Sequence, residues 1–180
     1  MFARALHALF RLSTTRELFV LVGVGLALLT GAMLVEQLRF VRDFTNDGAM
    51  LHEAEGIVDG LAGVLVAAGV FLESRDTLRR IAYPAPPPMD TVEARISEIA
   101  AQNGMGILMV GLLMEVGTLL IGLPKRVVDT HGFERVIFGA CALLSVVTLV
   151  ILYDFLVDAL LTYRMKREPL PPGALPPEGH

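Results

Sequence analysis

Two places in the sequence carry a histidine and a glutamate three residues apart, His52 with Glu55 and His131 with Glu134. Residues at positions i and i+3 share one face of a helix, so each pair can offer an imidazole and a carboxylate side by side. These donors suit Zn, Fe or Mn, and four of them would converge if the two helices are neighbours. The competing interpretation is structural, because a glutamate in the first turn of a helix caps free N–H groups and interacts favourably with the helix dipole.

The two pairs belong to a longer repeat. Segments 52–60 and 131–139 both fit the pattern H-x-x-E-x-[IV]-[IV]-x-G, 79 positions apart, and a weaker match relates the segments that begin at Gly25 and Gly111. Two tandem helical hairpins of the same topology would explain both matches. The alternative is chance similarity, because Gly and Val are abundant throughout the chain.

Glu115 is the second candidate for chemistry. It lies near the middle of an apolar run, where an uncompensated charge costs from ~2.5 to more than ~10 kcal/mol. One interpretation is a carboxylate coupled to proton or cation movement. The other is a protonated acid that hydrogen-bonds Thr30, Ser145 or Thr148 on neighbouring helices. No nucleophile–base set, phosphate-binding loop or dinucleotide fingerprint occurs in the sequence, so we predict no catalytic residues.

The elements that must position these residues are four apolar runs, at 18–38, 56–72, 105–123 and 136–156. A helix needs about 20 residues to cross a bilayer, and all four runs come close to that length or exceed it. They are apolar on every side, whereas the helices of a soluble bundle carry a polar stripe. The sequence therefore predicts an all-α integral membrane protein, with a four-transmembrane-helix bundle over residues 15–166.

The distribution of Lys and Arg predicts the orientation. Ten of these residues lie before the first run, in the loop 74–103 and after the last run, against five in the other two loops. An excess of cations marks the cytoplasmic side, so both termini are expected in the cytoplasm and the bundle in a bacterial inner (plasma) membrane. The net charge is −4 with no basic cluster, which argues against nucleic-acid binding.

Three cytoplasmic parts accompany the bundle. Residues 1–14 place apolar side chains at helical spacing among Arg and His, which is typical of an interfacial helix. Within the loop 74–103, a proline cluster precedes an amphipathic helix expected over 91–102. The last residues, 167–180, are rich in proline and are predicted to be disordered.

Small residues recur along the second run at Gly56, Gly60 and Gly63. Such a strip allows close helix packing, either inside the bundle or against another subunit or a second copy. We therefore favour an accessory or structural subunit of a membrane complex, whose partners are the lipid bilayer and other membrane subunits or copies of itself. The alternatives are an oligomeric proton- or cation-coupled transporter or channel that uses Glu115, and a membrane protein with a metal site built from the two H-x-x-E pairs.

Overall fold

The computed structural model describes residues 16–43, 48–82, 91–122 and 133–163, and almost all of them are helical. The predicted interfacial helix over 1–14 and the predicted tail over 167–180 lie outside the described residues. The described ranges form five helices: α2 (Arg16–Arg42), α3 (Gly48–Glu73), α4 (Arg75–Ala82), α5 (Thr91–Gly122) and α6 (Glu134–Tyr163).

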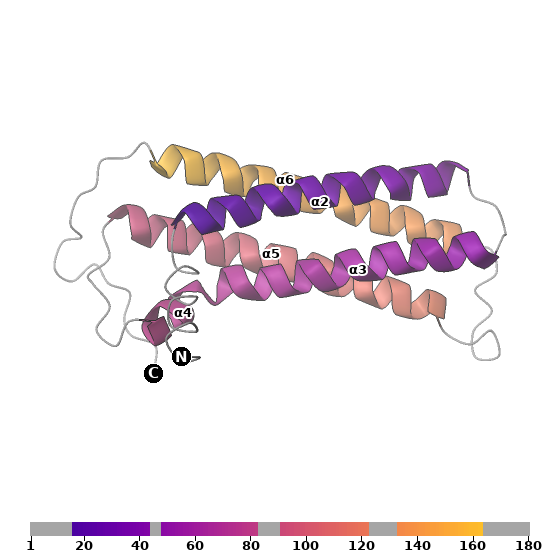
Figure 1. Cartoon of the computed structure of the whole chain (residues 1–180), viewed down its shortest axis with the longest axis horizontal. Helices are drawn as coiled ribbons and strands as arrows, with labels where there is room; N and C mark the ends of the chain where they lie inside the picture. The colour runs from indigo at the N-terminus through magenta and orange to yellow at the C-terminus, as the bar shows by residue number, and fades with distance from the viewer. Residues whose placement is uncertain (1–15, 44–47, 83–90, 123–132, 164–180) are drawn as a thin grey trace, which may run out of the picture.

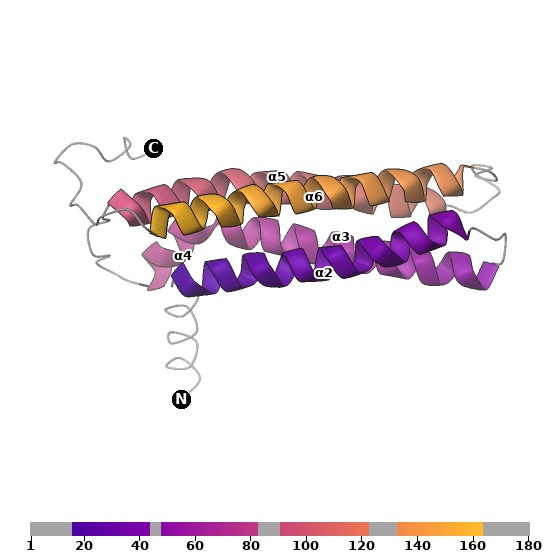
Figure 2. The same ribbon diagram turned by 90° about the horizontal axis from the view of Figure 1, so that it is seen from above.

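The four long helices run side by side as one antiparallel bundle, with the short α4 at one end (Figures 1 and 2). α3 packs most closely against α5, and α6 packs against both α5 and α2, whereas α2 and α3 are in looser contact. α3 and α6 therefore lie at opposite corners of the bundle. We call the end where α2 finishes and α3 begins the His52 end, and the end that carries α4 the Arg75 end.

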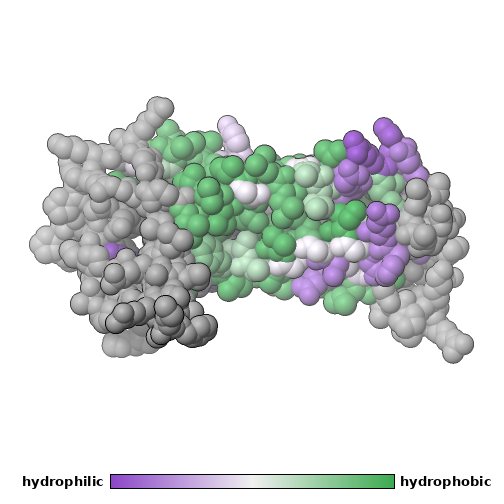
Figure 3. Space-filling model, in the orientation of Figure 1, coloured by the Kyte–Doolittle hydropathy of each residue, from purple (hydrophilic) through white to green (hydrophobic). Residues whose placement is uncertain are grey.

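The face of the bundle seen in Figure 3 is mainly apolar between these two ends. Large side chains such as Leu21, Leu28 and Leu119 point outward, with Leu28 71% exposed. The four long helices contain candidate membrane spans of 25, 22, 28 and 29 residues. Even the shortest rises about 33 Å, which is enough to cross ~30 Å of hydrocarbon. The prediction of a bundle of four helices that are apolar and long enough to span a membrane is confirmed.

The third long helix differs from the prediction. We expected an amphipathic surface helix over 91–102 that is separate from the span 105–123, but α5 is one continuous helix of 32 residues. Val92 and Ile99 are buried in the protein rather than laid on a membrane surface. The polar residues at the expected break do not end the helix, since Asn103 Nδ2 donates a hydrogen bond to the Ile99 carbonyl at 2.8 Å, within the helix itself.

The Arg75 end is closed by α4, a helix that the sequence analysis did not predict. Arg75 is only 4% exposed. Its guanidinium carbon lies 5.0 Å from the centroid of the Phe19 ring, and that ring stacks on Phe71 at 5.3 Å between centroids. A cation over an aromatic face is attracted by the ring quadrupole. Arg75, one of the cations counted for the orientation, thus takes part in packing.

Glycines allow the backbones of α3 and α5 to approach closely. A Cβ added to Gly69 would lie 2.6 Å from the backbone nitrogen of Leu108, and one added to Gly111 would lie 2.9 Å from the backbone nitrogen of Val66. Backbone atoms cannot move aside as a flexible side chain can. These positions are therefore where small residues hold the bundle together.

The internal repeat is not mirrored in the packing. At the offset of 79 positions, Asp59 corresponds to Phe138, yet Asp59 is exposed and Phe138 is 1% exposed. The buried positions of α3 and α6 match instead at an offset of 80 positions. The two motifs therefore differ in direction by about 100° around their helix axes. The internal repeat stays a prediction. The buried pairs at this offset are Ala54 with Glu134, Val58 with Phe138, Leu61 with Cys141, and Leu65 with Ser145.

The glycine contacts lead to a first prediction. Gly69→Ala should destabilise the bundle by about 1–3 kcal/mol, because the new methyl group must displace the α5 backbone. Gly25→Ala is the matched control, since a Cβ there meets nothing within 4 Å. Thermal unfolding in mild detergent measures both. An equal unfolding temperature for the two variants would contradict the close α3–α5 contact.

Candidate functional site

The two histidine–glutamate pairs are not brought together by the part of the bundle that is described. His52 Nδ1 lies 3.5 Å from Glu55 Oε2, and 90% of the His52 side chain is exposed. Glu134 is buried at the start of α6, in the corner opposite α3, and His131 lies outside the described residues. Within the described ranges no three His, Cys, Asp or Glu side chains group as metal ligands. A metal site that includes His131 stays a prediction.

Glu115 points away from the bundle interior. Its side chain is exposed on α5, and no hydrogen bond or ion pair reaches its carboxylate from the described residues. The partners expected for it are buried elsewhere: Ser145 donates to Gln37 Oε1 at 2.9 Å, and Thr148 donates to the carbonyl of its own helix at 3.0 Å. Thr30 is fully buried too. The expected interhelical hydrogen bond from Glu115 is therefore wrong, and this acid faces the surroundings of the bundle.

A second acid lies beside Glu115. Thr118 on α5 donates to Asp59 Oδ1 on α3 across a long 3.4 Å contact and to the Glu115 carbonyl at 2.8 Å. Asp59 is exposed as well. Because Glu115 precedes Thr118 by three residues, the two acids differ in depth by about 4.5 Å along the helices. We call the line of Asp59, Thr118 and Glu115 the acidic seam.

The small-residue strip on α3 also faces outward. A Cβ added to Gly56, Gly60 or Gly63 would meet nothing within 4 Å, in contrast to the glycines that pack against α5. Asp59 lies within this stretch of the helix, so the strip and the acidic seam occupy adjoining parts of the same outer surface. The sequence showed the strip but not its direction. The structure assigns it to the exterior and leaves it uncovered by the described helices.

One buried polar contact was missed by the sequence analysis. Gln37 is 3% exposed, and its Oε1 accepts the hydrogen bond from Ser145 that joins α2 to α6. Its Nε2 is buried without a hydrogen-bond partner among the described residues. The sequence does show an amide side chain within an apolar run, but only the fold shows which helix that amide faces.

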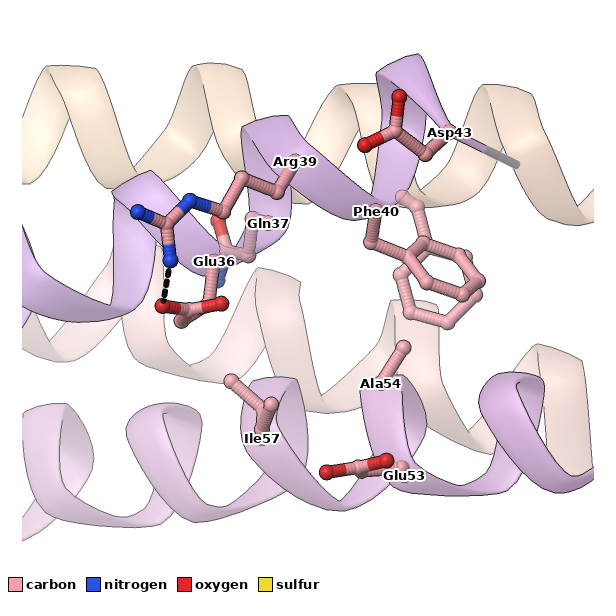
Figure 4. Close-up of a pocket in the computed structure, with 9 residues that line it drawn as sticks. Glu36, Gln37, Arg39, Phe40, Asp43, Glu53, Ala54 and Ile57 are labelled. Carbon is pink, nitrogen blue, oxygen red and sulfur yellow. Dashed lines mark hydrogen bonds and ion pairs between the residues drawn. The ribbon is translucent and has the colours of Figure 1, made fainter.

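A hollow of about 220 Å³ opens next to Gln37 at the His52 end, between α2 and α3 (Figure 4). Arg39 Nη1 lies 2.7 Å from Glu36 Oε1 on its rim. Asp43 lies on the same rim and accepts two hydrogen bonds of 2.8 Å from Arg42, which lower the pKa of the Asp43 carboxyl and keep it ionised. The remaining lining residues are Gln37, Phe40, Glu53, Ala54, Ile57 and Phe138.

No known protein family, curated protein sequence or solved structure matches this chain. What the fold and its surface define is a class: an all-helical bundle of four helices that can span a membrane, with two acids and a glycine strip on its outer face. Its biochemical role has to be inferred from these features.

The buried amide gives the second prediction. Ser145→Ala should lower the unfolding free energy by about 0.5–1.5 kcal/mol, because Gln37 then loses its hydrogen-bond donor in an apolar interior. Thr148→Val is the control, since it removes a hydroxyl bonded only within its own helix. A thermodynamic cycle with Gln37→Leu isolates the pair. Additive effects of Ser145→Ala and Gln37→Leu would show that the contact contributes nothing.

Proposed function

We propose that this chain is an accessory or structural subunit of a membrane complex and that it docks through the outer face of α3. The observation that carries the proposal is the uncovered strip at Gly56, Gly60 and Gly63. In lipid, helices associate chiefly through close packing and interhelical polar contacts. A smooth strip of glycines therefore favours the close packing of a further helix against α3. The glycines inside the bundle are already in such contacts, and these three are not.

The acidic seam supports the same proposal. Asp59 and Glu115 are exposed on a surface that is otherwise apolar. A carboxylate that faces hydrocarbon is unfavourable by several kcal/mol unless it is protonated or paired. A partner helix docked on the strip would remove both side chains from lipid and could supply a cationic or hydrogen-bonding group. The fold of this chain alone offers them only Thr118 among the described residues.

The proposed setting is a bacterial inner (plasma) membrane with both termini in the cytoplasm. The excess of Lys and Arg in the segments that adjoin the Arg75 end supports this orientation. The strip would then lie toward the outer leaflet, because Gly56 is one turn from His52 at the opposite end.

A second candidate function is an oligomeric proton- or cation-coupled transporter or channel. The specific observation in its favour is the row of oxygen-bearing groups along the acidic seam, at the depth of the apolar span. Because Glu115 faces outward, a path could not run through a single bundle. It would form where the seams of two copies meet.

The docking proposal predicts the effect of a single steric change. Gly60→Leu should remove most of the larger complex in blue-native electrophoresis of mild-detergent extracts, because a leucine fits the fold but blocks the strip. Gly25→Leu is the matched control, a glycine on α2 that also has open space. Unchanged migration of the Gly60→Leu protein, or a wild-type protein that migrates only as a free monomer, would refute the proposal. Protein identification in the excised band distinguishes another subunit from a second copy.

The alternative function makes a different prediction. Glu115→Gln, reconstituted in proteoliposomes, should abolish proton or cation flux, because the amide cannot exchange a proton. Asp154→Asn is the control, an exposed acid at the Arg75 end. Flux that survives Glu115→Gln would rule out the transporter, and a wild-type protein without flux would leave the subunit as the only one of the two functions.

A further inference from the structure

The loose contact between α2 and α3 leaves a groove that borders the strip at Gly56 and Gly60. The hollow beside Gln37 shares Glu53 and Ile57 with a second hollow of about 360 Å³ that lies further along the same two helices. Together they form one elongated depression on the surface, which we call the α2–α3 groove. The hollow beside Gln37, which is the first part of this groove, is seen in Figure 4 between the ribbon of α2 above and that of α3 below.

The mouth of this groove is polar, and most of its charges are already matched. Arg39 pairs with Glu36, and Arg42 pairs with Asp43. Glu53 has no hydrogen bond or ion pair within the described ranges. The buried amide of Gln37 also keeps one polar atom unmatched, whichever way the amide is turned. The unmet need at the mouth is therefore a cation for the Glu53 carboxylate, since the unmatched Gln37 nitrogen is buried beneath the surface.

The body of the groove is apolar. Gly56 and Gly60 leave space on the α3 side because they carry no side chains. The other residues that line it are Leu29, Met33, Ile57, Leu61 and Val64. No charged side chain follows Glu53 along this part. A hydrocarbon chain fits such a surface, whereas a polar ligand does not.

The length of the groove matches a lipid of one leaflet. From Glu53 to Val64 the groove extends about 16 Å along α3. This is about half of the ~30 Å hydrocarbon thickness, which is the depth of one leaflet. A lipid of the leaflet at the His52 end needs only this length.

We infer that the α2–α3 groove is a binding site for a phospholipid with a primary ammonium headgroup, of the phosphatidylethanolamine type. The ammonium pairs with Glu53, and one acyl chain lies in the apolar body of the groove. An anionic head without an ammonium group would bring its charge to an unpaired carboxylate. The site is formed within one copy of the chain. It shares Gly56 and Gly60 with the strip proposed for docking, so a partner helix on the strip would contact the bound lipid or displace it.

Native mass spectrometry of the full-length protein, titrated in mild detergent with palmitoyl-oleoyl phosphatidylethanolamine or phosphatidylglycerol, tests this inference. The wild-type protein should retain phosphatidylethanolamine about fivefold more tightly than phosphatidylglycerol. Glu53→Gln should remove that preference, because it replaces the carboxylate by a neutral group of the same shape. Asp154→Asn, the control at the Arg75 end, should keep it. Equal retention of the two lipids by the wild-type protein would overturn the inference.

A second pair of variants tests the body of the groove. Val64→Trp should fill the groove and lower retention of phosphatidylethanolamine by about fivefold or more. Val150→Trp on α6 is the matched control, because both valines are exposed on the spans and only Val64 lines the groove. Circular dichroism and gel filtration check that both variants fold. Equal retention by the two variants would show that the lipid binds elsewhere or that another protein helix occupies the groove, and would refute the site.

Discussion

The close packing of α3 against α5 is the constraint on which the rest of the bundle depends. It requires glycine where the backbones meet, at Gly69 and Gly111, and so sets the rotation of both helices about their axes. With that rotation fixed, the other glycines of α3 are turned away from the interior. The acids Asp59 and Glu115 are left on the outer side of the same helix pair. One contact thus decides what the protein presents to its surroundings.

The same packing has a second effect on the opposite side of α3. α2 joins the bundle mainly through α6, where Ser145 and Gln37 are hydrogen-bonded, and it approaches α3 only loosely. The groove between α2 and α3 follows from this division. The bundle therefore consists of a tight pair, α3 with α5, and a second pair, α2 with α6, joined more firmly along one side than along the other.

The sequence could predict the four spans because length and all-round apolarity can be read along the chain without knowing the neighbours of each helix. It could not predict which face of each helix is buried. In a soluble bundle a polar stripe marks the outer face, but a helix in lipid is apolar on both faces. This is why the direction of Glu115, the exposure of the strip at Gly56, and the contact of Gln37 with Ser145 required the structure. The continuous α5 was missed for another reason, since the polar residues near Asn103 resemble a helix end although they bond within the helix.

The pairing of α2 with α6 also has a consequence for how the protein is made. Of the four long helices, α2 is synthesised first and its main partner, α6, is synthesised last. Thr30 and Gln37 are buried in the complete bundle, and Gln37 is hydrogen-bonded to α6. Before α6 is synthesised, the surface that covers these two side chains is missing. α3 and α5 can associate earlier, as their contact needs no residue of α6. Assembly of the bundle is thus a late event, and α2 stays incompletely packed until α6 has been synthesised.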